Sequence, residues 1–295
     1  LAMLCVAFTS AISFAQLGTD VYTLGLDDAD NYSVTSWNTT TQGQGFSDWV
    51  FDTSTPEGGS AGRFLGSFST ALDVSSNSFG LFANSGNNAA SGASRSLPQT
   101  LQEEDVFTIA IGVNFRDGAK GFDLRDSSNN TILNFNVGSD EYTIDGTILF
   151  SNAYDANTVI TFTFTQNATT LDWTAVRSGG STGTQSGTKN AVNAGTITNL
   201  RLYNVSAGTN NDGGAGERNL YFNSLEFTSK YTINNNSTAA SDADITIPYL
   251  TVESGSTVNI ASGSSLIING TSTGTVTYNR NIPTTNWHLV SAPVE

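Results

Sequence analysis

Hydrophobic and polar residues alternate most regularly between Val106 and Phe150. At the start of this stretch one face carries large apolar side chains and the other carries small or polar ones. A period of two is typical of a half-buried β-strand. The polar runs RDGAK, DSSNN and GSDE then divide the stretch into short segments. We therefore expect a series of short antiparallel strands joined by tight turns, the first with its apolar face at Phe107, Ile109, Ile111, Val113 and Phe115.

The same alternation recurs elsewhere, and no convincing segment has the 3.6-residue period of an amphipathic helix. Ile160, Phe162 and Phe164 share one face of a further strand. Near Asn223 the alternation changes face, which predicts a β-bulge. The sequence contains about a dozen such short strands with Gly-rich turns between them. This pattern predicts an all-β fold whose main part is an antiparallel two-sheet jelly-roll sandwich.

The composition and the repeat pattern of the sequence change near Ile233. NNNSTAASDAD indicates a linker, and an eight-residue repeat follows it as LTVESGST, VNIASGSS and LIINGTST from Leu250 onward. A unit this short cannot bury its own apolar face, so we expect the units to stack as in a β-solenoid, with a plain meander of hairpins as the alternative. The expected divisions are a jelly-roll sandwich over 16–232, a linker over 233–244, and solenoid-like repeats with the start of a further β unit over 245–295.

The first segment, LAMLCVAFTSAISFAQ, is typical of the apolar core of a secretory signal peptide and ends in a small-x-small pattern at 13–15. We interpret residues 1–15 as a signal peptide without its charged front part; a hydrophobic first strand is the alternative. The expected location is therefore outside the cell or on its surface. Cys5, the single cysteine, would leave with the signal, so no thiol would remain for a disulfide or a thiolate metal site.

The chain is strongly acidic, with a formal net charge of -15, although only 13% of its residues are charged. The phosphates of nucleic acids and of anionic membranes would be repelled, so neither is an expected partner. No later apolar run approaches the roughly 20 residues of a membrane span, so we do not expect membrane insertion. The uncharged polar surface suits an extracellular β-protein with many turns.

Sequence motifs for catalysis are weak. Residues 58–62 and 179–183 match the nucleophile pattern G-x-S-x-G, but 29 glycines make chance matches expected, and no helix pattern follows either one. The single histidine, His288, excludes His-based metal sites and lies in a different part of the chain from both serines. No strand carries the spaced carboxylates of a β-sandwich glucanase. We predict no catalytic residues and a protein that is not an enzyme.

Calcium is the ion that the sequence favours. Asp27, Asp28 and Asp30 cluster in one predicted loop, and TNNDGGAGE over 209–217 offers further oxygen ligands. Hard cations prefer several such oxygens, although neither run has EF-hand spacing. We therefore predict a structural calcium at the three aspartates as the one candidate cofactor.

The polar side of the Val106–Phe150 strands offers a candidate ligand-binding surface. Asp123, Arg125, Asn134 and Asn136 fall on that side. Such side chains can hydrogen-bond sugar hydroxyls, so we predict a carbohydrate-binding surface there. A solvated outer sheet with no ligand is the alternative, because antiparallel sheets commonly leave one face wet. Trp173 alternates with Leu171 on what is expected to be the core face, which favours packing over stacking on a sugar.

Two parts of the chain resemble known proteins. Residues 250–295, LTVESGSTVNIASGSSLIINGTSTGTVTYNRNIPTTNWHLVSAPVE, resemble a recurrent region of large secreted Bacteroidota proteins. In those proteins stacked repeats precede a Trp-x-Leu-Val-Ser-x-Pro-Val strand and a C-terminal sorting domain of the type IX secretion system. Residues 40–228 resemble the jelly-roll, concanavalin A-like modules of secreted multidomain proteins through SFGLFANSG (78–86), KGFDLRD (120–126), LNFNVG (133–138) and RNLYFNSLEF (218–227).

The second resemblance implies a carbohydrate-binding, adhesive or spacer role. We therefore expect an exported, non-catalytic surface module whose partner is a polysaccharide or a cell-surface glycan. One alternative is an accessory region of a secreted polysaccharide-degrading enzyme whose catalytic domain lies outside these residues. A pure structural spacer is the other.

Overall fold

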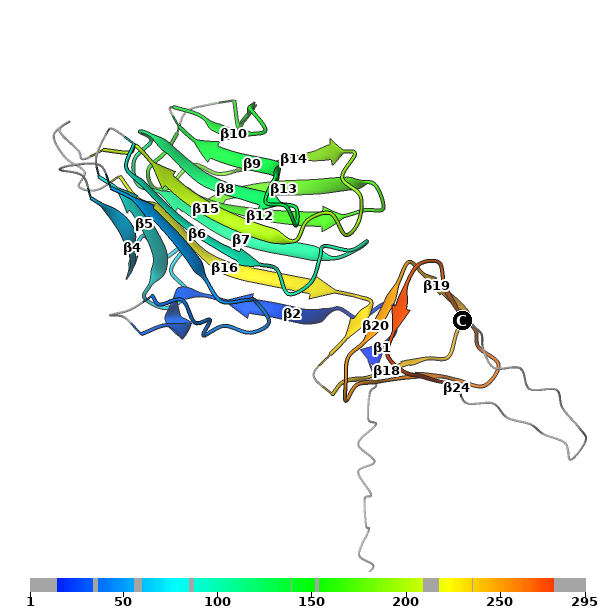
Figure 1. Cartoon of the computed structure of the whole chain (residues 1–295). Coiled ribbons are helices and arrows are strands. Elements are labelled where there is room, and N and C mark those ends of the chain that lie inside the picture. Colours follow the sequence, from blue (N-terminus) through cyan, green and yellow to red (C-terminus); the bar gives the residue numbers. More distant parts are fainter. Residues whose placement is uncertain are drawn as a thin grey trace, which may run out of the picture. The chain divides into compact units, whose positions relative to one another are not determined.

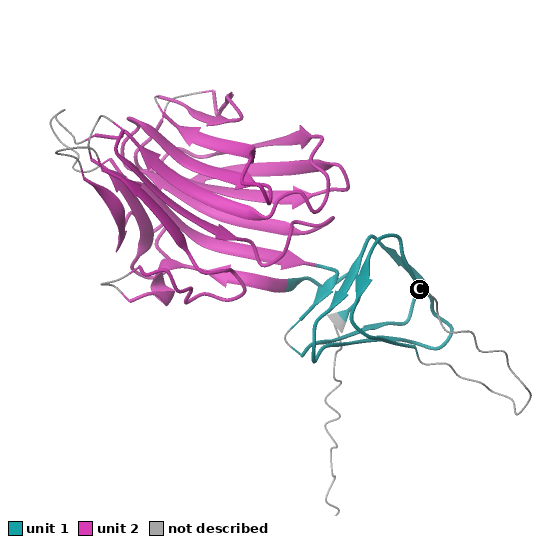
Figure 2. Ribbon diagram, in the orientation of Figure 1, with its two compact units in different colours: residues 1–22, 230–295 teal, residues 23–229 magenta. Residues whose placement is uncertain are grey.

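The computed structural model describes residues 15–33, 37–55, 60–84, 88–138, 140–151, 154–208, 218–234 and 236–278. The predicted signal peptide, apart from Ala15, and the chain after Tyr278 therefore lie outside the described residues. The chain divides into a larger unit, residues 23–229, and a smaller unit formed by residues 1–22 with 230–295 (Figure 2). Within the described ranges, no helix is long and apolar enough to cross a membrane.

The larger unit is an antiparallel two-sheet jelly-roll sandwich, as predicted, with one 3-10 helix, η1 (Ala29–Asn31) (Figure 1). The seven-stranded sheet contains, in spatial order, β11 (Thr147–Leu149), β10 (Tyr142–Ile144), β9 (Thr131–Val137), β8 (Ala119–Arg125), β15 (Asn199–Val205), β6 (Ala90–Ser96) and β3 (Val50–Ser54). The eight-stranded sheet contains β14 (Gly183–Asn190), β13 (Thr170–Ser178), β12 (Val159–Gln166), β7 (Val106–Val113), β16 (Leu220–Ser229), β5 (Ser78–Ala83) and β4 (Ala61–Gly66), with β2 (Tyr22–Asp27) paired to β16.

The core lies between the two sheets and is dominated by aromatic rings. The expected apolar face is confirmed at Phe107, Ile109, Ile111 and Val113 of β7, which are all buried. Phe115 lies beyond the end of the strand and is only half-buried. Phe162 of β12 meets rings from the opposite sheet, at centroid distances of 5.3 Å from Phe122 and 4.6 Å from Phe135. Such ring pairs add to the burial of apolar area that drives the two sheets together.

The strands between Val106 and Phe150 are divided between the two sheets. β7 lies between β12 and β16 in the eight-stranded sheet, whereas β8 to β11 belong to the seven-stranded sheet. The chain therefore crosses from one sheet to the other in the turn over 114–118. Period-two alternation shows that each strand has one face in the core, but it does not show to which of the two sheets the strand belongs.

The predicted bulge near Asn223 is present. The register of β16 against β7 shifts between Asn223 and Glu226, and Ser224 has a φ of 53°. The bulge buries the Asn223 side chain, whose Oδ1 accepts a hydrogen bond from the backbone N–H of Ala29 at 2.9 Å. Its Nδ2 donates to the backbone oxygens of Leu72 (3.2 Å) and Asn77 (2.9 Å). The extra residue thus turns one amide side chain inward, where it bonds two segments, η1 and the connection over 67–77 between β4 and β5.

The smaller unit is built from short strands that pair in parallel. One sheet contains β1 (Ala15–Gln16), β18 (Thr238–Ser241), β21 (Thr257–Ile260) and β24 (Val276–Tyr278). The other two contain β17 (Thr232–Ile233), β20 (Leu250–Val252) and β23 (Ser272–Thr273), and β19 (Ile245–Ile247) with β22 (Leu266–Ile268).

The eight-residue repeats form successive sides of a coil. The units that begin at Leu250, Val258 and Leu266 belong to three different sheets. Each side pairs with the equivalent side of the neighbouring turn, as in the pairs Thr238 with Thr257 and Ile245 with Leu266. Stacking therefore occurs at every third unit, because consecutive units lie on different sides.

The boundaries of the smaller unit differ from the expected ones. The predicted linker over 233–244 contains the whole of β18, which is paired on both edges, and residues 15–22 join this unit through β1. The polar composition of NNNSTAASDAD suggested a linker, but Ala239 and Ser241 are buried beneath the next turn of the coil. Parallel pairing with a later segment supplies the burial that this segment lacks by itself.

Candidate functional site

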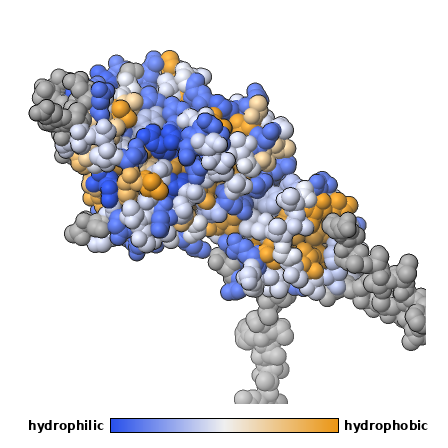
Figure 3. All heavy atoms as spheres, in the orientation of Figure 1, coloured by the Kyte–Doolittle hydropathy of each residue, from blue (hydrophilic) through white to orange (hydrophobic). Residues whose placement is uncertain are grey.

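The four residues predicted to bind a ligand lie next to one another on the outer face of the seven-stranded sheet. In β8 the residues on either side of Asp123 point into the core, so Asp123 and Arg125 lie on the opposite face. The register pairs Asp123 with Asn134 of β9 and places Asn136 opposite Gly121. Figure 3 shows strongly hydrophilic residues gathered on the larger unit in the region of β8 and β15.

Asp123 is the centre of this cluster. Its Oδ2 accepts hydrogen bonds from Nη2 and Nε of Arg125 at 2.6 and 3.2 Å, and its Oδ1 accepts from Nδ2 of Asn134 at 2.9 Å. The Asp123 side chain is only 8% exposed, whereas that of Arg125 is 20% exposed. The carboxylate is thus fixed by its neighbours, and the arginine is the part that solvent reaches.

Strand β15 adds Tyr203, which lies opposite Gly121. The Tyr203 hydroxyl accepts from Nδ2 of Asn134 at 2.8 Å and lies 3.1 Å from both Oδ1 of Asn136 and the backbone oxygen of Phe135, to one of which it donates. These contacts on β9 require the ring to cross β8 above Gly121, where no Cβ obstructs it. Burial raises the pKa of Tyr203 to about 12, which keeps the hydroxyl protonated at neutral pH.

Arg201 joins the cluster to the far edge of the sheet. Its Nη2 forms an ion pair with Oδ2 of Asp52, on β3, at 3.0 Å, and its Nη1 lies 4.0 Å from Oδ2 of Asp123. The Asp52 side chain lies across Gly92 of β6, where the lack of a side chain leaves room for it. A Cβ at Gly92 would fall 2.1 Å from Oδ1 of Asp52. We call the set Asp52, Asp123, Arg125, Asn134, Asn136, Arg201 and Tyr203 the polar face.

Sequence reasoning missed Asp52, Arg201 and Tyr203. The signal for two of them was present, since Arg201 and Tyr203 alternate with buried Leu200 and Leu202 and so had to face outward. The strand that would adjoin β8 was not deducible, because β15 is distant from β8 in the sequence. Only the register brings these side chains beside Asp123.

Several groups of the polar face remain available for a ligand. Nη1 of Arg125 and Nδ2 of Asn136 make no hydrogen bond to the residues that the structure describes, and Asp52 is 55% exposed. Guanidinium and amide N–H groups donate, and carboxylate oxygens accept, in directions fixed by the network behind them. Such a surface can hydrogen-bond a ligand that carries several hydroxyl groups.

The tryptophans in the described part of the chain belong to the core. Trp37 and Trp49 are 4% and 1% exposed, with ring centroids 5.2 Å apart. Trp173 is 9% exposed and lies against Gly187 of the neighbouring strand, as its alternation with Leu171 predicted. None of the three offers a free ring face for stacking on a sugar.

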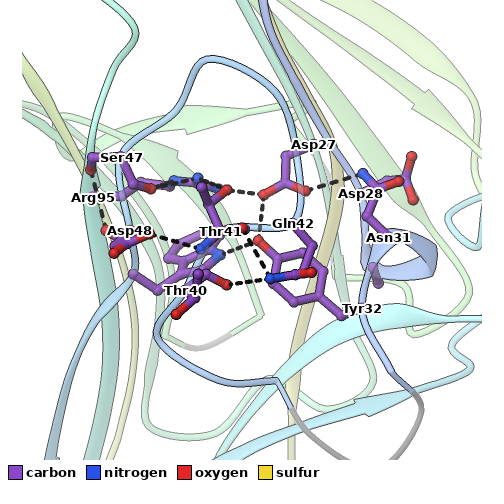
Figure 4. A network of polar contacts seen from close by, with 12 residues as sticks. Asp27, Asp28, Asn31, Tyr32, Thr40, Thr41, Gln42, Ser47, Asp48 and Arg95 are labelled. Atoms are coloured by element: carbon purple, nitrogen blue, oxygen red, sulfur yellow. Dashed lines mark hydrogen bonds and ion pairs between the residues drawn. The ribbon is translucent and has the colours of Figure 1, made fainter.

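Asp27, one of the three predicted calcium ligands, is fully buried and forms an ion pair (Figure 4). Its Oδ2 lies 2.5 Å from Nη1 of Arg95 and accepts a hydrogen bond from the hydroxyl of Tyr32 at 2.8 Å. Its Oδ1 accepts from Nδ2 of Asn31 at 3.2 Å. Both oxygens of Asp27 therefore already have partners within the protein.

Asp28 and Asp30 have other partners. Oδ1 of Asp28 accepts from the backbone N–H of Asp30 at the start of η1, while Oδ2 of Asp30 accepts from the N–H and hydroxyl of Ser75 at 2.7 and 2.6 Å. No group of three or more Asp, Glu, His or Cys side chains arranged to hold a metal occurs among the described residues. TNNDGGAGE lies outside them. Calcium binding at the three aspartates stays a prediction.

The G-x-S-x-G match at 179–183 forms the hairpin between β13 and β14. Ser181 is tied to Asp155, whose Oδ2 accepts from the Ser181 N–H and hydroxyl, each at 2.7 Å. These bonds hold the loop, and the segment is followed by a strand instead of the helix that a nucleophile elbow requires. The match at 58–62 lies partly outside the described residues, and His288 lies wholly outside them.

Comparison with known proteins finds likeness in structure alone. No protein-family model matches the sequence, and no curated protein does either. Among solved structures, a peanut lectin with a 9-mer peptide is 10% identical, with a TM-score of 0.39 over 71% of this chain and 97% of the lectin. The cellulose induced protein Cip1 is 14% identical, with a TM-score of 0.39 over 71% of this chain and 99% of its own.

A third similar structure is the catalytic domain of a GH131 beta-glucanase from Podospora anserina. It is 10% identical, with a TM-score of 0.39 over 69% of this chain and 91% of that domain. These identities are too low for the activity or ligand of any of these proteins to be assigned to this chain.

Proposed function

We propose that the chain is an exported, non-catalytic module that binds carbohydrate through the polar face. The observation that carries the proposal is the register of β9, β8 and β15, which gathers amide, guanidinium, phenol and carboxylate groups on one outer sheet face. A solvated sheet face has no need of such a network. Here Asp123 and Tyr203 are almost buried within it, which holds the outward groups in fixed directions.

The chemistry of the polar face suits sugar hydroxyls. A hydroxyl group donates one hydrogen bond and accepts others, so it pairs well with a surface that mixes fixed donors with fixed acceptors. Arg125 and Asn136 supply donors with no described acceptor, and Asp52 supplies an exposed acceptor. With a net charge of -15 the chain would repel highly sulfated or phosphorylated polymers, which favours neutral glycans for this surface.

The carboxylates of the polar face support a binding role over hydrolysis. Glycosidases use two carboxyl groups, one of which must donate a proton to the leaving oxygen. Asp123 is ion-paired with Arg125, and Asp52 is ion-paired with Arg201. Both carboxylates thus already have an arginine partner, which supports recognition without bond cleavage as the function proposed.

Export and surface display complete the proposal. The apolar segment over 1–15 and the resemblance of 250–295 to repeats of type IX-secreted proteins support a secreted or cell-surface location. A low content of charged residues, with a surface rich in Asn, Thr and Ser, also supports it. An accessory role beside a catalytic domain would use the same polar face and the same ligand class.

Binding of neutral polysaccharides by the whole chain tests the proposal. We expect saturable binding to at least one neutral polysaccharide on a glycan array, with and without calcium. Asn136→Ala should weaken that binding about 5–10-fold, because it removes one hydrogen bond of about 1–1.5 kcal/mol. Titration calorimetry with the ligand that the array identifies would measure the change.

Thr174→Ala is the matched control, because Thr174 is a polar residue on the outer face of the other sheet. Its binding should equal that of the unmodified chain. An array without any carbohydrate ligand would contradict the proposal, and so would equal losses in the two variants. Release of reducing ends from the bound polysaccharide would contradict the non-catalytic part.

A further inference from the structure

A pocket of about 510 Å³ opens between the edge strands β11 and β14, apart from the polar face. Each strand lies at an edge of its sheet, so the pocket lies at an open side of the sandwich. Ile148, Phe150 and Ser151 form one wall, and residues 182–185 form the other. The volume falls in the range of small-molecule sites in proteins.

Arg177 lines this pocket from the core side of β13. It follows buried Trp173 and Ala175 on the inward face, where β-sandwiches normally place apolar side chains. The residue is only 8% exposed. A charged side chain at this depth is expected to have a counter-ion and hydrogen-bond acceptors.

The guanidinium of Arg177 has neither among the described residues. Nε and Nη1 are covered and have no hydrogen-bond partner, and no described carboxylate forms an ion pair with the side chain. The guanidinium carbon lies 4.7 Å from the centroid of the Phe150 ring. Nη2 is not one of these covered atoms, so it is the nitrogen that we expect a ligand in the pocket to contact.

Asp155, a carboxylate that bonds the neighbouring hairpin, has its own hydrogen-bond partners. Asp155 accepts from the N–H of Asn157 at 2.9 Å and from the N–H and hydroxyl of Ser181 at 2.7 Å each. These bonds, the Asn157 amide first among them, lower the pKa of Asp155 to about 2. The aspartate therefore fixes the hairpin that forms one wall of the pocket and leaves Arg177 unpaired.

The opposite wall holds an unusual backbone. Phe150 and Ser151 have φ values of 61° and 37°, a left-handed conformation that is costly for a bulky side chain. The side-chain Oε1 of Gln185 accepts from the Phe150 N–H at 2.7 Å and so links this strained segment to β14. Strain of this kind persists where the surrounding structure enforces it, and here it places the Phe150 ring beside Arg177.

We propose that this pocket binds a carboxylate-bearing sugar, a uronic acid unit, whose carboxylate pairs with Arg177. A guanidinium binds a carboxylate with charge-assisted hydrogen bonds, which would supply the partner that Arg177 lacks. Phe150 and Ile148 offer apolar surface to the C–H groups of a sugar ring, and Ser151, Thr182 and Thr184 offer hydroxyls to its polar edge. This site is independent of the polar face and of the neutral ligand proposed for it.

Titration of the whole chain with D-galacturonate and D-glucuronate tests the proposal, with galactose, acetate and an oligogalacturonate as comparison ligands. Galacturonate or glucuronate should bind saturably, and galactose should bind at least tenfold more weakly because it lacks the carboxylate. Acetate should also bind more weakly, because it lacks the ring. Tighter binding of the oligogalacturonate than of the monomer would identify a polymer end as the source of the uronate.

Arg177→Met should weaken uronate binding at least tenfold, while Arg116→Met, which removes an exposed arginine, and Asn136→Ala on the polar face should leave it unchanged. Arg177→Met should also keep or raise the melting temperature of the ligand-free protein, because it replaces an unpaired buried charge with an apolar chain of similar length. Uronate should raise the melting temperature of the unmodified chain but not that of this variant.

The proposal would be overturned by an absence of uronate binding up to about 10 mM. Galactose binding that equals galacturonate binding and is lost in Arg177→Met would overturn it as well, because the pocket would then not select the carboxylate. So would unchanged binding in Arg177→Met. A marked loss of stability in that variant without ligand would show that Arg177 serves the fold and has protein partners in solution.

Discussion

Replacing Arg95 with methionine is expected to lower the free energy of unfolding by about 3–5 kcal/mol. The Arg95 and Asp27 side chains are both fully buried, so the substitution leaves a carboxylate without its counter-ion in the interior. The guanidinium also donates to Thr41 Oγ1 at 2.8 Å and to the backbone oxygen of Ser47 at 2.6 Å, and it lies 4.2 Å from the Trp49 ring centroid. Urea denaturation followed by tryptophan fluorescence would measure the loss.

The double variant Arg95→Met with Asp27→Leu separates the ion pair from its packing. Removing both charges should cost less than removing the arginine alone, because no unpaired charge remains. Arg116→Met is the control for an ion pair at the surface, since the Arg116 and Asp140 side chains are 44% and 67% exposed. We expect that control to change stability by less than about 1 kcal/mol. A loss below about 1 kcal/mol in Arg95→Met would contradict the prediction.

Stability is expected to rise by about 2 kcal/mol between about pH 7 and pH 9 because of Lys120. Lys120 lies on the core side of β8, fully buried, and its Nζ donates to the backbone oxygen of Asp117. Burial, with a smaller effect from nearby Arg218, lowers the pKa of Lys120 from 10.5 to about 7. Within that window the unfolded chain binds a proton that the folded chain lacks, so stability increases with pH.

The variant Lys120→Met isolates this effect. A shift from 10.5 to about 7 corresponds to a penalty of up to roughly 5 kcal/mol at low pH. The variant should therefore be more stable than the unmodified chain at pH 7, with a smaller slope between pH 7 and 9. Urea midpoints measured at several pH values would give both curves. Parallel curves for the two proteins would show that Lys120 is not the titrating group.

The increase of stability with pH should reverse at higher pH. Burial raises the pKa values of Tyr22 and Tyr203 to about 12, whereas tyrosine in the unfolded chain loses its proton near 10. Above about pH 10 the unfolded state therefore binds fewer protons than the folded state, and stability falls as pH rises. The maximum should lie between the two effects, at about pH 9–10.

The strands were predictable from the sequence, but their partners were not. The alternation around Phe107 and the face change at Asn223 identified β7 and the bulge in β16, because both are local patterns of burial. The crossing from one sheet to the other after Val113 has no such pattern, since either sheet could cover the same apolar face. The eight-residue repeat was visible, but a pairing with every third unit depends on how the coil closes.

The candidate sites show the same limit. Asp123 and Asn134 were predicted to share a face because each alternates with buried residues in its own strand. Tyr203 was missed because β15 reaches β8 only in three dimensions. Arg177 was missed for a different reason. It occupies a core position of β13 where the pattern predicts an apolar residue, and local rules most often fail at such exceptions.

The route of the chain through the smaller unit has a mechanical consequence. The chain enters this unit as β1, leaves it at residue 22 to build the sandwich, and returns to it at residue 230. Strand β1 is paired with β18, and β18 with β21, so residue 15 is linked to the later turns of the coil by lateral hydrogen bonds. Tension applied between residues 15 and 278 would therefore run through the coil. The sandwich is inserted in the chain between two segments of the smaller unit. It would therefore bear the force only after β1 had separated from β18.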